Sequence, residues 1–233
     1  MSTPVKRSYD ARGRQARAQQ TRQSVMDVAH DLFIAQGYGR TTVADIARGA
    51  DVSVETIYSA FGNKAALLRK IWYARFRGDE QDIRLLHRPE IQEMLAEPDL
   101  VVRLHRHARV VTPVFRRFVP LHRAIEAAAA IEPAAAAMVA EYDAGRLDAS
   151  THYAKAAKKT GQLAVSTAEC RDVFSATLDG TLWHRLVHES GWSDKRFTAF
   201  LGELWVSVLM QSASGNKAGG VGSSPASRSR RVG

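Results

Sequence analysis

The sequence contains one cysteine and no long apolar run, and each shortage excludes a class of protein. Cys170 is the single cysteine among 233 residues, so the chain forms neither an internal disulfide nor a thiolate metal cage. No apolar run approaches the roughly 18 residues of a membrane-spanning helix. The first residues lack the apolar stretch of a secretory signal. We therefore expect a cytoplasmic protein that has no membrane segment.

Strand patterns are also missing, because no stretch alternates apolar and polar residues over the length of a strand. Helical spacing is frequent instead. One helix face is formed by Val25, Val28, Ala29, Leu32 and Phe33. Similar patterns predict a helix that starts at Lys64 and ends before Pro89, one over 173–187 that runs to Gly191, and one over 193–209. The predicted fold class is all-α.

The net charge of +9 is concentrated at the two ends of the sequence. Residues 1–20 and 212–233 carry most of the basic excess, and residues 21–211 are nearly neutral. Blocks of like charge are usually disordered, and basic N-terminal arms often contact phosphate. We therefore expect a basic flexible arm at residues 1–20 and a disordered Gly/Ser-rich tail at residues 212–233. The tail either contacts DNA or is only solvated.

Two short helices, each opened by a hydroxyl residue, are predicted within "TTVADIARGADVSVETIYSAFGNK", residues 41–64. Thr42 is a natural N-cap with Asp45 three residues later, and Ser53 caps the second helix. Asn63 caps a third helix. Two short helices joined by a tight turn and supported by a preceding amphipathic helix form a helix-turn-helix unit.

The segment "VMDVAHDLFIAQGYGRTTVADIARGADVSVETIYSAFGNKAALL", residues 25–68, resembles the TetR family of bacterial transcriptional regulators. The spacing of the following residues matches the family's signature: Ala29, Phe33, Gly37, Thr42, Ile46, Ala47, Val52, Ser53, Tyr58, Phe61 and Lys64. Asp51 stands where the family commonly has Gly. The resemblance implies a three-helix DNA-binding domain at residues 21–66 and a helical effector-binding and dimerisation domain at residues 67–211.

The resemblance assigns phosphate contacts to Thr42, Tyr58 and Lys64. Base contacts should come from the start of the second short helix, at Ser53, Val54, Glu55, Thr56 and Ser59. The alternatives are that Thr42 is only a cap and that Glu55 is only a favourable anion in the first helical turn. Arginines of the arm could reach an adjacent minor groove: Arg12, Arg14 and Arg17.

The C-terminal domain should hold a largely apolar effector and a dimer interface. The candidate effector residues are Leu104, His107, Val111, Phe115, His122, Met138, Tyr142 and Trp183. For each of them, ordinary core packing is the alternative. The candidate dimer residues are Phe174, Leu178, Leu182, Phe197, Leu201, Leu204, Trp205 and Val208. The alternative is that this helical hairpin closes the core of a single chain.

These features predict a ligand-responsive repressor that binds a palindromic operator in double-stranded DNA as a homodimer and is released by a small, largely apolar effector. We expect no cofactor. One alternative is a DNA-binding protein that needs no ligand, and another is a protein–protein module that has lost DNA binding. A third is a metal-dependent helical enzyme, because His184, His188 and Glu189 are suitably spaced. That motif lacks a third ligand and the order of a zinc protease, so no metal or catalytic site is predicted.

Overall fold

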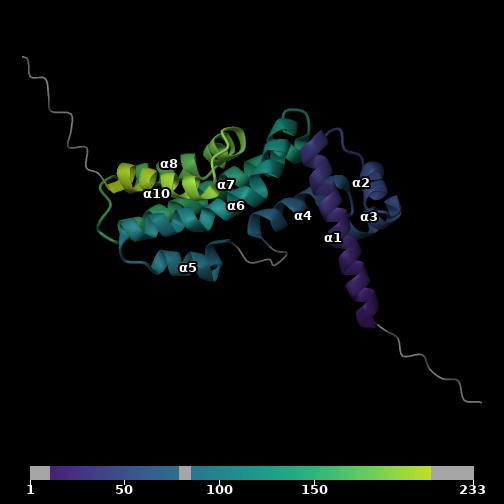
Figure 1. Cartoon of the computed structure of the whole chain (residues 1–233), viewed down its shortest axis with the longest axis horizontal. Helices are drawn as coiled ribbons and strands as arrows, with labels where there is room; N and C mark the ends of the chain where they lie inside the picture. The colour runs from purple at the N-terminus through teal and green to yellow at the C-terminus, as the bar shows by residue number, and fades with distance from the viewer. Residues whose placement is uncertain (1–10, 79–84, 211–233) are drawn as a thin grey trace, which may run out of the picture.

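The computed structural model describes residues 11–78 and 85–210, and within these ranges every regular element is a helix (Figure 1). The elements are α1 (Ala11–Gln36), α2 (Val43–Gly49), α3 (Val54–Phe61), α4 (Lys64–Arg77), η1 (Leu85–His87), α5 (Pro89–Ala96), α6 (Leu100–Ala128), α7 (Pro133–Lys158), α8 (Thr167–Thr177), α9 (Thr181–Trp183), η2 (His184–Glu189) and α10 (Asp194–Met210). The predicted all-α fold class is confirmed. Among the described residues, no helix combines the length and the apolar character needed to span a bilayer.

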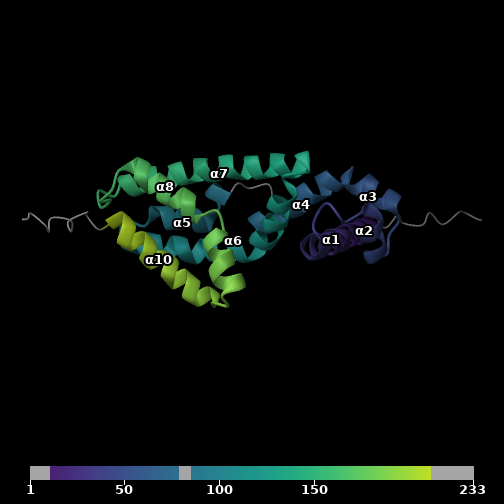
Figure 2. The ribbon, with the colours of Figure 1, turned by 90° about the horizontal axis from the view of Figure 1, so that it is seen from above.

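The molecule is elongated, with α1, α2 and α3 at one end and a bundle of α5 to α10 at the other (Figure 1). α4 lies between the two parts and packs against α1 on one side and against α6 and α7 on the other. α6 runs along the middle of the bundle, between α10 and the pair α7 and α8 (Figure 2). A movement of α4 therefore affects both parts of the molecule.

Local hydrogen bonds fix the starts of the short helices at the predicted residues. Thr42 and Asp45 form a reciprocal capping box at the start of α2. The Ser53 hydroxyl accepts a hydrogen bond from the backbone N–H of Thr56 at the start of α3. The Asn63 side chain accepts one from the backbone N–H of Ala66 at the start of α4. These bonds satisfy N–H groups that would otherwise have no partner.

The turn between α2 and α3 has a left-handed residue at Asp51, whose φ is 52°. Asp51 is the only described residue other than glycine with a positive φ. Asp adopts this conformation more readily than most residues because its short polar side chain can form local hydrogen bonds. The turn therefore keeps the geometry that the resemblance associates with glycine at this position.

α4 is shorter than predicted. It ends at Arg77, where Gly78 adopts a left-handed conformation with φ of 89° and donates its N–H to the carbonyl of Ala74. The prediction that this helix continues to just before Pro89 is wrong, because the cap at Gly78 ends it. Residues 79–84 lie outside the described residues, and Leu85–His87 forms only the short helix η1.

The helix predicted over 173–187 is also broken. α8 ends at Thr177, and Gly180 takes a left-handed conformation with φ of 86° before α9 begins. A Cβ atom at Gly180 would lie 2.6 Å from Val119 Cγ2 of α6. This close approach and the positive φ both require glycine, so the chain turns at the point where it crosses α6. The periodicity of the sequence could not reveal that crossing.

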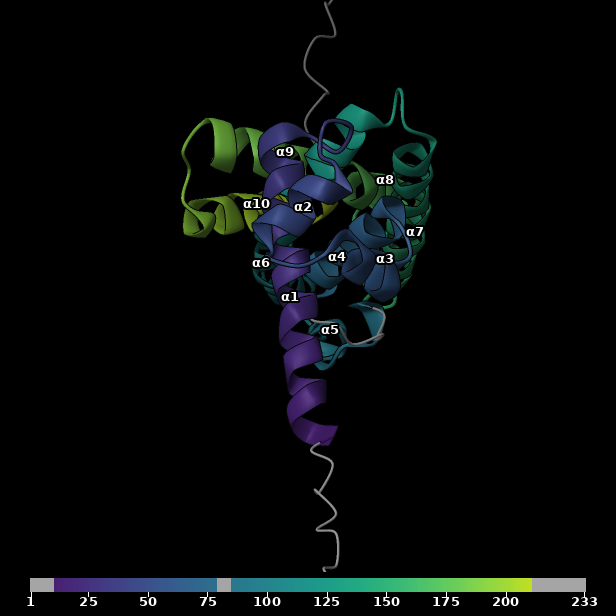
Figure 3. The same ribbon diagram turned by 90° about the vertical axis from the view of Figure 1, so that its right-hand side faces the viewer.

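The structure agrees only in part with the expectation of a flexible arm at residues 1–20. Residues 1–10 lie outside the described residues, whereas residues 11–20 belong to α1 and are helical. Their turns extend beyond the other helices of the DNA-binding end (Figure 3). The tail expected at residues 212–233 lies outside the described residues.

Candidate DNA-binding surface and effector cavity

α3 presents a polar face to solvent. Glu55, Thr56, Tyr58 and Ser59 are exposed, and Ile57 is fully buried on the opposite side. Tyr58 leaves half of its surface open, at 50%. The N-cap Ser53 is also exposed and Val54 is half-buried. The residues predicted to contact bases therefore belong to one accessible helix, which lies at the surface beside α1 and α2 (Figure 3).

Glu55 is held in its ionised form at the start of α3. A hydrogen bond from its own backbone N–H, followed by one from the Ser53 hydroxyl, lowers the pKa of its carboxyl group. Its side chain is fully exposed, so the carboxylate can also accept a hydrogen bond from a base amino group. Both roles considered for Glu55, the helix anion and the base contact, fit this position.

Thr42 is strongly engaged as a cap. Its hydroxyl donates a 2.6 Å hydrogen bond to Asp45 Oδ2 and accepts one from the backbone N–H of Asp45. A phosphate at this position would have to compete with Asp45 for the hydroxyl proton. The capping role of Thr42 is therefore confirmed, and its phosphate contact remains a prediction.

Lys64 serves the fold in a way that the sequence did not indicate. Its Nζ donates to the backbone carbonyls of Tyr38 and Thr41, at 3.0 and 3.1 Å. The same atom lies 4.1 Å from the centre of the Tyr38 ring, which is a cation–π contact. Lys64 therefore ties the start of α4 to the turn before α2. Two of its three protons are committed to this turn, so at most one remains for a phosphate.

The arm arginines are not placed as an extended arm would place them. Arg14 and Arg17 are exposed on the first turns of α1, and Arg12 lies in the same helix. An α-helix with its side chains is about 10–12 Å wide, whereas the minor groove is only about 6 Å wide. The helix itself is too wide to enter the minor groove, so only the side chains of these arginines could reach into it. Their minor-groove contact stays a prediction.

The bundle contains a cavity of about 490 Å³ between α4, α6 and α7. Seven of the 19 residues that line it are aromatic: Trp72, Tyr73, Phe76, Phe115, Phe118, Tyr142 and Tyr153. Arg77, Glu141, Arg146 and Asp148 add charged groups. Trp72 and Phe76 stack with ring centres 5.2 Å apart, so α4 contributes a continuous aromatic face. A cavity of this size and character suits a small, largely apolar molecule.

Four of the eight predicted effector residues line this cavity: His107, Val111, Phe115 and Tyr142. The other four are Leu104, His122, Met138 and Trp183, and they are buried without being part of its wall. Trp183 instead donates its Nε1–H to Asp194. For these four residues, the alternative of core packing is the one that the structure favours.

Sequence reasoning missed the parts of the wall that come from α4 and from the end of α7. Trp72, Phe76 and Tyr153 were not among the predicted effector residues. The spacing of Trp72 and Phe76, four residues apart, is a signal for a shared face. It does not reveal whether that face meets a neighbour or an empty space.

His107 and His122 are both kept uncharged by burial. Desolvation lowers the pKa of His107 to about 3 and that of His122 to about 4. The rings of Tyr153, Phe174 and Trp205 surround His107 with centre distances of 4.3, 5.4 and 4.9 Å. Burial also raises the pKa of the Tyr153 hydroxyl above its ordinary value. His107 and Tyr153 therefore make the inner wall of the cavity polar without adding a charge to it.

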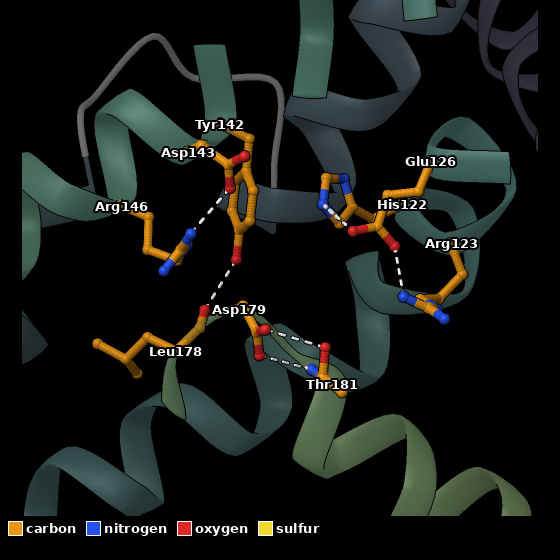
Figure 4. A network of polar contacts seen from close by, with 9 residues as sticks. All are labelled: His122, Arg123, Glu126, Tyr142, Asp143, Arg146, Leu178, Asp179 and Thr181. Carbon is orange, nitrogen blue, oxygen red and sulfur yellow. Dashed lines mark hydrogen bonds and ion pairs between the residues drawn. The ribbon is translucent and has the colours of Figure 1, made fainter. Parts of the chain in front are cut away.

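Polar contacts beside the cavity connect α7 to the turn between α8 and α9, and a separate set lies within α6 (Figure 4). The Tyr142 hydroxyl donates to the backbone carbonyl of Leu178 at 2.8 Å. Arg146 pairs with Asp143 at 2.9 Å, and the Asp179 carboxylate accepts hydrogen bonds from the N–H and hydroxyl of Thr181. These contacts hold the break at Gly180 in place and fix one wall of the cavity.

The cavity is connected to the DNA-binding end through Glu141. This residue lines the cavity, and its carboxylate accepts hydrogen bonds from Arg69 and from the Tyr73 hydroxyl, both on α4. Further along α4, Arg75 pairs with Asp27 of α1 at 2.8 Å. α4 is thus bonded both to the cavity wall and to the helix that supports the helix-turn-helix unit.

Comparison with known proteins agrees with this geometry. Residues 25–71 match the family model described as bacterial regulatory proteins, tetR family. The HTH-type transcriptional regulator AcrR of Shigella flexneri is 42% identical over 62 residues, which cover 27% of this chain and 29% of AcrR. The regulator AlkX of Mycobacterium tuberculosis is 39% identical over 46 residues, 20% of this chain and 22% of AlkX. The chain thus spans less than a third of the length of either relative.

Solved structures extend the likeness to the whole fold. A TetR-family regulator from Syntrophomonas wolfei superposes with a TM-score of 0.61 at 18% identity, over 81% of this chain and 94% of that one. A regulator from Saccharomonospora viridis in complex with choline gives a TM-score of 0.61 at 17% identity, over 83% and 99% of the two chains. The likeness to the tetR family model is thus confined to residues 25–71, and the solved structures share the fold of the chain.

Several of the predicted dimer residues are not available to a second copy of the chain. Phe174, Phe197, Leu201 and Trp205 are at most 2% exposed, because they pack inside the bundle. Leu178 is buried as well. The alternative reading, in which this hairpin closes the core of its own chain, is correct for these residues. Leu182 and Leu204 are half-buried and Val208 is exposed.

The described residues give the alternative of a metal enzyme no third ligand beside His184 and His188. His184 and His188 stack with ring centres 4.9 Å apart in the π-helical segment η2, and His184 Nε2 lies 3.3 Å from Glu189. Within the described ranges, no group of three or more His, Cys, Asp or Glu residues could hold a metal ion. The third ligand that was missing from the sequence is not supplied by the fold there.

Proposed function

We propose that this protein is a transcriptional regulator of the bacterial cytoplasm that binds a palindromic DNA site as a homodimer and is released by a small, largely apolar effector. One observation carries the proposal: α4 begins beside the exposed helix α3 and continues into the wall of an aromatic cavity. The comparisons support it, because the relatives over this segment are HTH-type transcriptional regulators.

The DNA contact would use α3 in the major groove. Its exposed side chains can meet base edges, and the uncovered N–H groups at the start of α2 can meet a phosphate. Two copies of α3 must reach half-sites about 34–36 Å apart, which is one turn of DNA. Their separation is therefore as important as their chemistry.

The effector would act through α4. The bonds of Arg69 and Tyr73 to Glu141 hold α4 in the orientation seen here. A ligand that fills the cavity beside Trp72 and Phe76 and favours another tilt of α4 would move α3 with it. Such a ligand shifts the equilibrium only by the difference between its affinities for the two orientations. Release from DNA follows when the preferred spacing of the two α3 helices no longer matches the half-sites.

The homodimer would be formed by the outer surfaces of α8 and α10. Leu204 and Val208 of α10 remain accessible there, in contrast to the buried residues on the inner side of the same helix. Replacing Val208 by Arg should convert the dimer to a monomer in light scattering. It should leave the circular dichroism of the chain unchanged, because this side chain is 38% exposed.

Binding-site selection with the purified full chain tests the proposal directly. We expect a palindrome that is bound at least about 10³ times more tightly than unrelated duplex. The variant Glu55→Ala should change the preferred base at one position of each half-site, and Arg40→Ala is a control on an exposed residue outside α3. Binding without sequence preference would favour the alternative of a ligand-independent architectural protein, and no binding would reject both.

A further inference from the structure

Two polar side chains in the cavity wall have no hydrogen-bond partner among the described residues. His107 is 3% exposed and Tyr153 is 6% exposed, their rings are 4.3 Å apart, and both line the cavity. Neither residue is among those with an unbonded side-chain N or O atom that is closed off from solvent, so we infer that their polar atoms face the space of the cavity. A molecule in the cavity could therefore form hydrogen bonds with both side chains.

Neighbouring buried polar groups of the bundle are bonded within the chain. The Tyr142 hydroxyl, which is also in the cavity wall, donates to the carbonyl of Leu178. The Thr112 hydroxyl donates to Ala108, and Trp205 Nε1–H donates to Thr177. The unpaired atoms that are closed off from solvent include Nδ1 of His122 and Nε1 of Trp72. His107 and Tyr153 differ from these because they form a touching pair that combines donors with acceptors and shares one cavity.

The charge state of the pair limits what it can bind. The other ring neighbours of His107 are Phe174 and Trp205, so no ionised side chain stacks against it. Two of the charged groups elsewhere in the wall already have partners, since Glu141 is bonded to Arg69 and Arg146 to Asp143. An ion placed at the pair would be desolvated without a counter-charge, which is unfavourable. A neutral imidazole and a phenol each offer a donor and an acceptor.

We propose that His107 and Tyr153 bind the hydroxyl group of an uncharged aromatic effector, whose ring system occupies the cavity between Trp72, Phe76 and Phe118. A hydroxyl both donates and accepts, so it can satisfy the imidazole and the phenol together. The aromatic walls suit a planar apolar body. This inference rests on the proposed function only in that it takes the cavity to be the effector site. It adds the chemical class of the ligand and the two side chains that select it.

Calorimetric titration of the full chain with three matched probes tests the inference. The probes are 2-naphthol, 2-methylnaphthalene and 2-naphthoate, which share a ring system and differ in one uncharged, apolar or anionic group. We expect 2-naphthol to bind at least about tenfold more tightly than either of the other two, the effect of one or two buried hydrogen bonds. Equal affinity for 2-naphthol and 2-methylnaphthalene, tightest binding of 2-naphthoate, or no binding of any probe would overturn the inference.

Single-residue variants test whether His107 and Tyr153 bind the hydroxyl group of 2-naphthol. Tyr153→Phe and His107→Phe should each reduce the preference for 2-naphthol over 2-methylnaphthalene to about threefold or less, since each removes one partner. Tyr142→Phe is the matched control: it also removes a hydroxyl from the cavity wall, but one already bonded to Leu178. That variant should keep the full preference. If Tyr142→Phe abolished the preference and the other two retained it, the assignment to His107 and Tyr153 would be wrong.

The inference and the proposed function fail in different ways. Probe binding is measured on the protein alone, so it does not depend on finding an operator. If 2-naphthol binds with the expected preference but leaves operator affinity unchanged, the inference about the hydroxyl-binding pair stands. The proposed mechanism of release from DNA then fails. If an operator is found and no probe binds, DNA recognition stands and the inference about the ligand fails.

Discussion

The two ends of this molecule differ in how far apart in sequence their stabilising polar contacts lie. At the DNA-binding end, Thr42, Ser53 and Asn63 each bond a backbone N–H three residues away. In the bundle, Tyr142 bonds Leu178 across 36 residues and Thr198 bonds Thr112 across 86. Short-range contacts set the helix starts at the DNA-binding end, where Lys64 adds a longer tie, whereas long-range contacts shape the cavity of the bundle. The first arrangement suits a DNA-reading surface, and the second suits a cavity whose shape can change.

Trp205→Ala should produce the largest loss of stability, because it removes a fully buried ring from the bundle, where the long-range contacts lie. The variant leaves a cavity beside His107 and Phe174 and removes the hydrogen bond from Nε1–H to Thr177. We expect the free energy of unfolding to fall by about 3–5 kcal/mol, measured by urea denaturation. The exposed, non-core variant Ile131→Ala is the control and should change stability little. A loss below about 1 kcal/mol for Trp205→Ala would show that the bundle does not depend on this contact.

Acid should destabilise the bundle before the DNA-binding end. His107 and His122 have folded-state pKa values of about 3 and about 4, lowered from 6.5 chiefly by burial. Between these values and 6.5 the unfolded chain binds more protons than the folded chain, so stability falls as the pH falls through that window. Each histidine should contribute about 1.4 kcal/mol per pH unit.

The variant His107→Phe checks this acid effect. It removes one titrating group from an aromatic cluster, so the slope of stability against pH between 6.5 and 4 should become smaller, whatever the absolute stability of the variant. An unchanged slope would mean that His107 does not titrate differently in the folded and unfolded states. Denaturation followed at several pH values provides the measurement.

Lys64→Met tests the main long-range contact at the DNA-binding end. The variant keeps much of the aliphatic stem but leaves the carbonyls of Tyr38 and Thr41 without their charged donor. We expect a stability loss of about 1.5–3 kcal/mol. The salt dependence of DNA binding should hardly change if Lys64 is a structural anchor. A clear reduction of the salt slope, with stability unchanged, would restore the predicted phosphate contact instead.

Asp51 tests a purely local feature and should give the smallest effect. Replacing it by Val, a β-branched residue, at φ of 52° should cost about 1–2 kcal/mol. Replacing it by Gly should be neutral or slightly stabilising, because glycine adopts this conformation without strain. Thermal unfolding of both variants gives the comparison. If the two variants had equal stability, the left-handed turn would not be a constraint on this position.

Residue spacing was sufficient to predict the helix-turn-helix unit, its three caps and the accessible face of α3. It was insufficient for the cavity: His107, Val111, Phe115 and Tyr142 were predicted, but the contributions of Trp72 and Tyr153 were not. It also misplaced the dimer surface, because an apolar helix face has the same pattern whether it meets its own chain or a second copy. Trp205 and Val208, on one helix, illustrate the difference.

The sequence by itself determined the class of the fold, the ends of the short helices and the chemistry of the surface offered to DNA. These features depend on contacts within one or two helical turns, which the order of residues specifies directly. Only the tertiary structure decided that Lys64 anchors a turn, that Gly180 must break a helix where it crosses α6, and that His107 and Tyr153 meet unpaired in a cavity. Each of these depends on which distant segments come together, and the periodicity of a single helix carries no information about its neighbours.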